Sequence, residues 1–278
     1  MSQWISTNSA ELEALRKRLE TVEWHIRQMR TYSVRTQRHA YMAAAAERIR
    51  DRGQTPRRAP EFRSQYGEDL LLYDLFEGKP EGFFIEAGAF NGVDFSATYA
   101  FEQIGWSGLL VEPIPERAEQ CRSNRPFSRV VHAALGSPGD PPTVTLESTQ
   151  DQFGGMFSYV NTGSTHHNSM STSGVPITSV KVPQVTLDSL LDSHQGPIDL
   201  VILDVEDNEL RVLAGFDMSR HRPRVFLVED GSIGKNQPLH AAIMRHQYTL
   251  MGWMGVNAIY IHNGEDALRR RFADLLRA

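Results

Sequence analysis

The sequence contains a single cysteine, Cys121, among its 278 residues. One thiol excludes an intramolecular disulfide and a zinc site built from several cysteines, so we expect a reducing compartment. The chain also lacks any apolar run that approaches the ~18 residues of a membrane span, and Met1 is not followed by the basic and apolar segments of a secretory leader. These absences predict a soluble, cytoplasmic protein.

Biased composition is absent as well. With 21 glycines and 14 prolines the chain lies close to the globular average, which excludes collagen-like and largely disordered classes. Its length allows one large domain with an appendage, or two small domains. The charge is divided unevenly, because residues 1–60 carry 12 Lys and Arg against 6 Asp and Glu, whereas residues 61–278 carry 17 against 28. This split predicts a basic segment over 1–60 and a main domain over 61–278.

The basic segment has the pattern of a coiled coil. Between Glu11 and Arg30 the apolar residues follow a 3,4,3,4,3 spacing, which is typical of the seam between paired helices: Leu12, Leu15, Leu19, Val22, Ile26 and Met29. We expect a helix that begins near Ser9 and can continue through Ala43–Ala46. We predict that it makes the protein a homo-oligomer. A basic arm for an acidic partner and a helix folded onto its own subunit are the alternatives.

The main domain alternates β-rich runs with helical stretches. The expected strands are Phe83–Ala87, Leu109–Glu112, Arg129–His132, Leu200–Asp204, Val225–Glu229, Thr249–Trp253 and Ala258–His262. The expected helices are Asp94–Ile104, Pro115–Arg122, Asn208–Leu213, Leu239–Arg245 and Glu265–Leu276. This order predicts an α/β fold of the Rossmann-like kind, with a mostly parallel sheet of seven strands covered by helices on both faces. Ligands of such sheets bind beyond the carboxyl ends of the strands.

A turn with two glycines follows the first expected strand. It reads Glu86-Ala87-Gly88-Ala89-Phe90-Asn91-Gly92, and Glu112, which ends the second strand, lies 20 residues beyond Gly92. A carboxylate at this distance can accept hydrogen bonds from both hydroxyls of a ribose. A dinucleotide site needs three glycines as G-x-G-x-x-G, whereas this turn lacks the middle glycine and carries an acid, Glu86. An acid there suits the ammonium group of S-adenosylmethionine better than a pyrophosphate.

Six blocks between about Ser64 and His262 resemble FkbM-type methyltransferases. In chain order they are Ser64-Gln65-Tyr66-Gly67-Glu68-Asp69, the turn from Glu86 to Gly92, Gly105-Trp106-Ser107-Gly108-Leu109-Leu110-Val111-Glu112-Pro113, Ala133-Ala134-Leu135-Gly136, Val185-Thr186-Leu187-Asp188 and Asp204-Val205-Glu206. The resemblance implies a class I methyltransferase domain that uses S-adenosylmethionine. Members of this family mostly O-methylate hydroxyls of natural products, sugars and glycolipids.

The resemblance also implies a set of cofactor-binding residues. They are Glu86, Gly88 and Asn91 for the methionine portion, Glu112 for the ribose, His132 and Ala133 for the adenine, and Gly92, Gln65 and Ser96 as further contacts. The chain departs from the family at Asp207, where a glycine usually follows the Asp-x-Glu block. Aspartate tolerates unusual backbone angles better than most residues.

Methyl transfer to a hydroxyl requires that the hydroxyl lose its proton, so a base, a metal or both are expected. Asp204, Glu229 and Asp230 lie at the ends of two strands, and we expect them to converge on Mg²⁺ or a similar hard cation. Capping of neighbouring helices by these carboxylates is the alternative. Asp204 and Glu206 are also candidate catalytic residues.

Two histidines are rival candidates for the base. His166 and His167 lie in a stretch rich in Ser, Thr, Gly and Asn that lacks clear periodicity. Long segments of this kind in a compact domain often have a function. We therefore expect an insertion over residues 148–181 that covers the acceptor.

The sequence thus predicts an S-adenosylmethionine-dependent O-methyltransferase that acts on a hydroxyl of a sugar, a glycolipid or a polyketide-like natural product. An NAD-dependent Rossmann oxidoreductase and a non-catalytic methyltransferase-like scaffold are the alternatives. No zinc-finger, RNP or helix-turn-helix pattern indicates a nucleic-acid partner. Membrane association is not expected either, because the three arginines of the last helix suit a solvated face.

Overall fold

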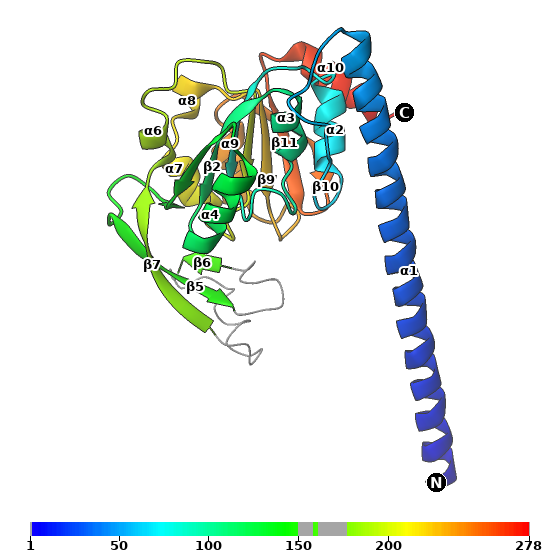
Figure 1. The fold of residues 1–278 in the computed structure, drawn as a ribbon. Helices are drawn as coiled ribbons and strands as arrows, with labels where there is room; N and C mark the ends of the chain where they lie inside the picture. The colour runs from blue at the N-terminus through cyan, green and yellow to red at the C-terminus, as the bar shows by residue number, and fades with distance from the viewer. Residues whose placement is uncertain (1, 150–157, 161–176, 278) are drawn as a thin grey trace.

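A computed structural model of the protein describes residues 2–149, 158–160 and 177–277. Its centre is a seven-stranded sheet with the order β10-β11-β9-β8-β1-β2-β3 (Figure 1). The strands are β1 (Phe83–Ala87), β2 (Ser107–Glu112), β3 (Arg129–His132), β8 (Leu200–Leu203), β9 (Val225–Glu229), β10 (Tyr248–Met254) and β11 (Asn257–His262). The neighbours from β3 to β9 run parallel, and β11 runs antiparallel to both β9 and β10. The predicted seven-stranded, mostly parallel sheet is confirmed.

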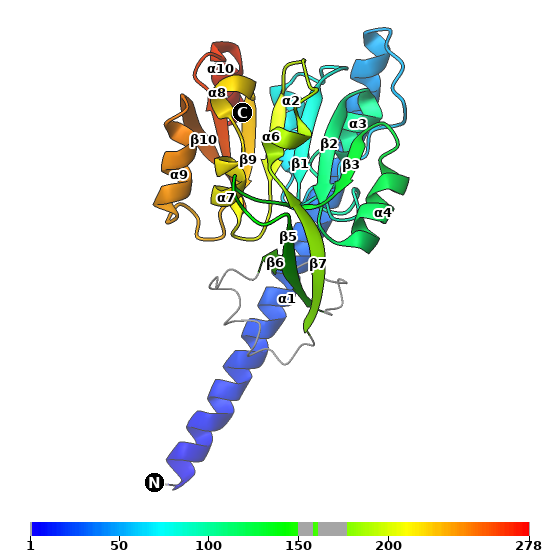
Figure 2. The ribbon, with the colours of Figure 1, turned by 90° about the vertical axis from the view of Figure 1, so that its left-hand side faces the viewer.

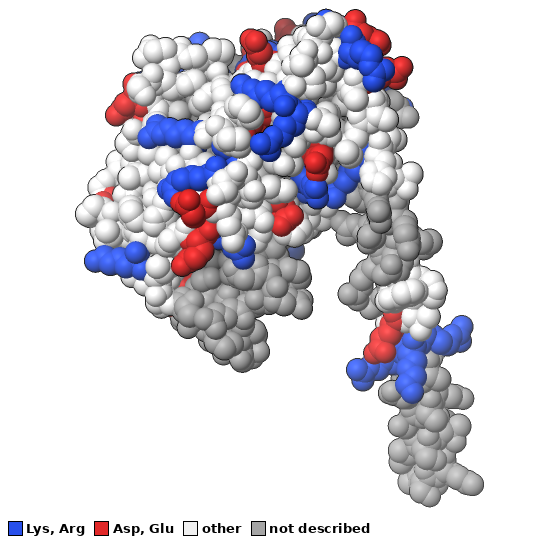
Figure 3. Space-filling view, in the orientation of Figure 1, with Lys and Arg blue, Asp and Glu red and all other residues white. Residues whose placement is uncertain are grey.

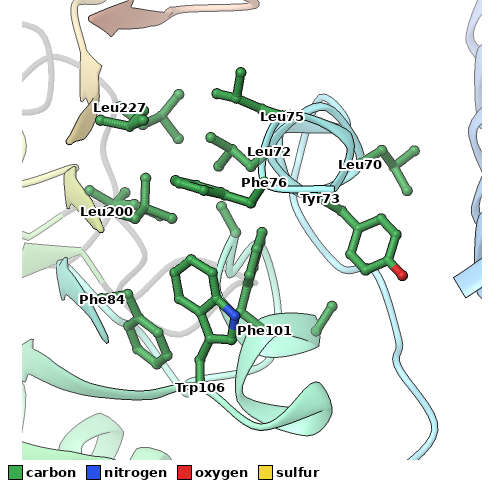
Figure 4. Close-up of a cluster of buried hydrophobic side chains, with 14 of the residues drawn as sticks. Leu70, Leu72, Tyr73, Leu75, Phe76, Phe84, Phe101, Trp106, Leu200 and Leu227 are labelled. Carbon is green, nitrogen blue, oxygen red and sulfur yellow. The ribbon is translucent and has the colours of Figure 1, made fainter. Parts of the chain in front are cut away.

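Helices cover both faces of this sheet. The first face carries α2 (Glu68–Leu75), α3 (Tyr99–Ile104), α4 (Pro115–Asn124) and α10 (Asp266–Leu275), and the second carries α6 (Leu187–Leu190), α7 (Glu209–Ala214), α8 (Met218–His221) and α9 (Gln237–Met244). Because side chains alternate along a strand, Phe84 packs on the first face and Ile85 on the second. On the first face Phe76, Phe101 and Trp106 meet edge to face beneath α2 (Figure 4). Helices packed on both faces hold the sheet in place and thereby fix the positions of the carboxyl ends of its strands.

Helix α1 (Ser2–Asp51) is 50 residues long, and most of it projects away from the domain (Figures 1 and 3). Its last turns pack on the body, where Ala45 and Ile49 are buried in the same cluster as Phe62 and Tyr73. The helix does continue through the alanine block, as predicted, but it begins well before Ser9. The described part of the body therefore carries α1 as an arm that is anchored at one end.

Several polar contacts strengthen this anchor. The hydroxyl of Tyr41 donates to Asp74 at 2.7 Å, and Arg48 lies 3.5 Å from the same carboxylate. Arg38 donates to the carbonyl of Ser64, and Arg52 to that of Gly78. All four contacts lie within residues 38–52, so the anchor and the expected seam occupy different parts of the helix.

A second, smaller sheet lies below the main one (Figure 2). It has the order β4-β7-β5-β6, with β4 (Ala134–Leu135), β5 (Thr143–Thr149), β6 (Ser158–Val160) and β7 (Ile177–Val185). The sequence did not predict this sheet. Both ends of the expected insertion over 148–181 are strands. β5 and β7 pair antiparallel, from Thr143 opposite Pro183 to Thr149 opposite Ile177. His166 and His167 lie outside the described residues.

The remaining differences from the sequence prediction are small. The expected helix at Asp94–Ile104 is shorter, because α3 begins at Tyr99 and the residues before it form a loop. The structure also contains α2, which the sequence did not indicate. Among the described residues, no helix is long and apolar enough to cross a membrane.

Candidate active site

A cavity of about 380 Å³ lies at the carboxyl ends of β1, β2, β8 and β9. This is where the strand order changes direction, since the chain passes from β1 to β2 on one side and returns to β8 on the other. Eight of the predicted cofactor-binding and catalytic residues line the cavity: Gln65, Glu86, Gly88, Ser96, Glu112, Ala133, Asp204 and Glu206. Glu229, from the predicted metal set, lines it as well. The strand ends therefore bring most of the predicted residues together.

The turn after β1 requires glycine at position 88. Gly88 has a φ of +84°, and a Cβ at this position would lie 1.7 Å from the carbonyl oxygen of Asp204. No side chain fits between the turn and the end of β8. The amide nitrogens of Gly88 and Ala89 both donate to the carbonyl of Val111, at 3.0 and 3.2 Å. These contacts hold the turn between β2 and β8 and leave its inner surface open to the cavity.

Glu112 presents a carboxylate from the end of β2 to the cavity. Its two oxygens accept from the amides of Phe90 and Ile114, each at 2.8 Å, and the residue is 5% exposed. Burial raises the pKa of Glu112 to about 7, although the two amide donors lower it in part. A carboxylate has about four acceptor positions, so each oxygen can accept one more hydrogen bond. Two free positions on one fixed carboxylate match the two hydroxyls of a ribose.

Glu86 occupies a different environment from the one expected. It is 4% exposed, and its oxygens accept from Ser96 at 2.9 Å, from the amide of Ala97 at 3.1 Å and from Thr98, with Arg125 at 3.5 Å. The carboxylate thus ties the loop before α3 to β1. Although Glu86 borders the cavity, four donors of the protein already contact its two oxygens.

Three predicted cofactor residues support the cavity from behind and do not line it. The side-chain oxygen of Asn91 accepts from the amides of Val93 and Asp94, at 3.0 and 2.8 Å, and therefore caps the loop. Gly92 has a φ of +78°, and its carbonyl accepts from Arg125 at 3.0 Å. His132 contacts the carbonyl of Pro113 at 3.0 Å through Nε2.

Asp204, Glu206 and Glu229, hereafter the β8–β9 carboxylates, line the opposite side of the cavity. Asp204 is exposed, but the surface that it exposes is the cavity wall. Confinement within protein and the neighbouring Glu229 carboxylate raise the pKa of Asp204 well above its usual value, and a hydrogen bond joins the two carboxyl groups. Burial raises the pKa of Glu229 to about 7 and that of Glu206, which Asp204 raises further, to about 8. The three groups therefore share fewer than three negative charges near neutral pH.

The three predicted metal ligands do not converge on one point in the structure, because only Asp204 and Glu229 line the cavity. Asp230 accepts from Ser232, from the amide of Gly234 at 2.8 Å and from His240 at 3.0 Å, and it does not line the cavity. Burial favours a higher pKa for Asp230, but these donors outweigh it and hold the pKa below the usual value. The described part of the chain contains no group of three His, Cys, Asp or Glu that could hold a metal ion. Asp230 instead shapes the loop after β9, and its role as a metal ligand stays a prediction.

Sequence reasoning missed several residues of the cavity wall. Glu68, at the start of α2, accepts from the side chain of Asn257 at 2.6 Å and from the amide of Tyr66 at 2.8 Å, and all three line the cavity. The Ser64–Asp69 block contains Glu68, so a signal for it was present. Nothing in the sequence marked Asn257 or Phe95, which is 45% exposed with a φ of +64°.

Comparison with known proteins identifies the family of the chain. The sequence model of the methyltransferase FkbM domain matches residues 86–249, which is more than half of the chain. The chain therefore belongs to the FkbM methyltransferase family. The matched region begins at Glu86, near the end of β1, and contains β2, β8 and β9, whose carboxyl ends line the cavity. No curated protein matches the chain.

Several solved methyltransferase structures align with the chain at low sequence identity. A TehB-like SAM-dependent methyltransferase from Corynebacterium glutamicum is 13% identical, with 80% of this chain and 98% of that chain covered and a TM-score of 0.38. An O-methyltransferase from Bacillus cereus in complex with SAH is 12% identical, with 80% and 89% covered and a TM-score of 0.36. Cofactor-bound Rv0187 from MTB is 19% identical, with 81% and 90% covered and a TM-score of 0.37.

Proposed function

We propose that this methyltransferase uses S-adenosylmethionine and transfers the methyl group to a hydroxyl of a sugar, a glycolipid or a polyketide-like natural product. The observation that carries the proposal is Glu112, a buried carboxylate with two unused acceptor positions, set 20 residues beyond Gly92 at the end of the neighbouring strand. Family membership supports the class of reaction.

The cavity fits this cofactor on its β1–β2 side. Glu112 would bind the ribose hydroxyls, and the Gly88 turn leaves room for the chain that links ribose and methionine. Ala133 and Ile114 offer an apolar wall suited to the adenine. When bound, S-adenosylmethionine supplies an electrophilic methyl group. Because Glu86 is already engaged by protein donors, we assign it to holding the loop and not to binding the ammonium group.

The acceptor side of the cavity supplies groups that can take up a proton. The β8–β9 carboxylates lie across the cavity from Glu112, and their raised pKa values make their ionised forms stronger bases than ordinary carboxylates. We propose that the pair of Asp204 and Glu229 accepts the hydroxyl proton as the acceptor reacts. Leu135 and Leu146 of the small sheet border the same cavity, which supports an acceptor with an apolar part.

Calorimetric titration with S-adenosylhomocysteine, and separately with NAD, tests the cofactor. We expect micromolar binding of S-adenosylhomocysteine alone. In Glu112→Ala the affinity should fall at least tenfold, because two hydrogen bonds to a buried carboxylate are lost. Glu119→Ala, on the exposed side of α4, is the matched control and should bind as the wild type does. Binding of NAD alone would favour the oxidoreductase, and binding of neither ligand would favour a scaffold.

We propose in addition that α1 joins two or more copies of the chain, and that the protein is cytoplasmic. The first proposal is supported by the heptad spacing and by the exposure of Leu15, Leu19 and Val22, each of which is more than half exposed. The second rests on the single thiol, which burial makes inert by raising the pKa of Cys121 to about 12.

A further inference from the structure

The cavity is lined by carboxylates and has no basic side chain among the described residues of its wall. Seven acidic residues line it: Glu68, Glu86, Asp94, Glu112, Asp204, Glu206 and Glu229. Residues 150–157 and 161–176, which the structure does not describe, contain no Lys or Arg in their sequence. A fixed positive charge is therefore missing from the wall and from the sequence of the segment that follows β5.

These carboxylates differ in which neighbouring groups offset their negative charge. Arg125 lies 3.5 Å from Glu86, and Glu112 accepts two amide hydrogen bonds. The β8–β9 carboxylates have no Lys or Arg partner within the part of the chain that the structure describes. Instead they repel one another, since Asp204 raises the pKa of Glu206, and Glu206 raises that of Glu229. A cation beside them would relieve this repulsion.

The geometry brings the end of β8, which carries Asp204, to the proposed path of the cofactor. Asp204 touches the Gly88 turn, because its carbonyl oxygen occupies the place that a Cβ of residue 88 would need. Its charge also acts across the cavity on Glu112, whose pKa it raises. The part of the cavity between the proposed ribose site at Glu112 and the acceptor side therefore lies beside Asp204.

Methyl transfer changes the charge of the cofactor at this place. The acceptor oxygen forms a bond to the methyl carbon, the carbon–sulfur bond breaks, and its electron pair stays on sulfur. The hydroxyl proton goes to a carboxylate of the β8–β9 group. S-adenosylmethionine carries a sulfonium, whereas the S-adenosylhomocysteine that remains has a neutral thioether. The two molecules are otherwise the same except for the methyl group.

Resting on the proposed function, we infer that the β8–β9 carboxylates distinguish the methylated cofactor from the spent product by charge. They hold the sulfonium form more tightly and favour exchange of S-adenosylhomocysteine for a fresh cofactor. Glu206 and Glu229 are thus specificity-determining residues for the cofactor, in addition to any part in proton uptake.

The test compares the dissociation constants of S-adenosylmethionine and S-adenosylhomocysteine by calorimetry on the full chain without an acceptor. In the wild type we expect S-adenosylmethionine to bind roughly tenfold more tightly, as a unit charge near partly screened carboxylates implies. The ratio compared is the dissociation constant of S-adenosylhomocysteine divided by that of S-adenosylmethionine. Glu206→Gln and Glu229→Gln should each reduce this ratio several-fold, mainly by weakening the binding of S-adenosylmethionine. Glu112→Gln is the matched control, since the ribose is common to both ligands, so both affinities should fall and the ratio should stay.

A second measurement needs no variant. The ratio of the two dissociation constants in the wild type should rise from pH 6 to pH 8, because Glu229 and Glu206, with pKa values of about 7 and about 8, ionise over this range and the sulfonium charge is permanent. The groups that face them are Glu68 from α2, Glu86 from β1, Glu112 from β2, Asp94 from the loop before α3, and Glu209 and Asp207 around the start of α7.

Each outcome decides the inference. A ratio near one that does not change with pH or in either Gln variant would overturn it, while binding of S-adenosylhomocysteine would still support the proposed function. A ratio that falls equally in Glu112→Gln and Glu206→Gln would also overturn it, because the effect would then be general to the cavity. Failure of both ligands to bind would overturn the inference and the proposed function together.

Discussion

Glu206 and Asp207 both adopt left-handed backbone angles, with φ of 54° and 68°. Such angles are costly for residues other than glycine, and Asp is among the residues that tolerate them best. At Asp207, where the family usually has glycine, the chain therefore keeps the backbone turn that glycine would allow. The turn directs Glu206 into the cavity wall, although neighbouring carboxylates oppose its charge.

The prediction for Asp204→Asn follows from its place in the carboxyl pair. The amide cannot take up a proton, so we expect kcat to fall by about 10² to 10⁴. The affinity for S-adenosylhomocysteine should change less than threefold, since the neutral thioether has no charge to lose. Calorimetry and a methyl-transfer assay on the same preparation measure both quantities. A variant with full turnover would remove Asp204 from the chemistry.

The raised pKa values also predict how stability depends on pH. Glu206, Glu112 and Glu229 have folded pKa values of about 8, 7 and 7, against an ordinary 4.5, so between pH 4.5 and 8 the folded state binds more protons than the unfolded state. Their contribution to the free energy of unfolding is thus greatest below pH 4.5 and is lost as the pH rises to 8. We expect a higher Tm at pH 6 than at pH 8 without cofactor.

Glu206→Gln provides the control for this pH dependence. Glutamine does not titrate, so the difference in Tm between pH 6 and pH 8 should narrow in this variant. An unchanged difference would assign the pH dependence to other groups.

Glu229 and Asp230 show what a sequence can and cannot reveal about single residues. Both were placed correctly at the end of a strand, yet neighbouring side chains on a strand point to opposite sides. Glu229 faces the cavity, and Asp230 turns to Ser232 and His240. Position along the chain predicts the edge of the sheet but not the side of the strand, and hence the three expected metal ligands do not converge.

At the scale of elements, Arg125 connects four parts of the fold. It follows α4, is 1% exposed, and donates to Glu102 at 3.0 Å, to the carbonyl of Gly92 at 3.0 Å and to Thr98 at 2.9 Å, with Glu86 nearby. The guanidinium thereby joins α4, α3, β1 and the loop that borders the cavity. This loop takes the place of the first turns of the helix expected over Asp94–Ile104.

Arg125→Met should therefore destabilise the domain. Removing one partner leaves the carboxylates of Glu86 and Glu102 buried without a cation, which costs about 3–5 kcal/mol. Denaturant unfolding measures the loss. Arg122→Met, three residues earlier, removes an exposed pair with Glu119 and should cost less than about 1 kcal/mol. Equal losses in the free energy of unfolding for the two substitutions would show that the buried network stabilises the domain no more than the exposed ion pair does.

The strands of the main sheet were predictable because they are apolar on both faces. Leu200–Leu203 is fully buried, and Phe83–Ala87 and Val225–Glu229 have the predicted bounds. The small sheet was missed for the opposite reason. Its strands carry Thr, Ser and Lys, and β5 and β7 are stabilised by pairing between residues 28 to 40 positions apart, from Thr149 with Ile177 to Thr143 with Pro183. The hydrophobic pattern of a short segment does not predict such long-range pairing.

At the scale of the whole molecule, the anchor of α1 shows which truncation is informative. Ala45 and Ile49 belong to the core, so removing residues 1–55 would also expose the body. Deletion of residues 2–32 removes the seam and keeps every contact from Arg38 onward. We expect a lower molar mass by light scattering and a Tm within about 2 °C of the full chain.

A pair of point variants separates the seam from the rest of the exposed arm. Leu19→Asp places a charge on the seam and should lower the molar mass, whereas Lys17→Asp places the same side chain off the seam and should not. An unchanged mass in both the deletion and Leu19→Asp would refute self-association through α1.

The length of α1 has a further consequence for the hydrodynamic behaviour of the protein. At 1.5 Å per residue, 50 residues form a rod of about 75 Å, which is longer than a domain of this size is wide. A single copy with such a rod has a larger friction coefficient than a sphere of the same 31.4 kDa. It will leave a gel-filtration column early, at the volume of a heavier globular protein, so elution volume alone would report a dimer where there is one chain.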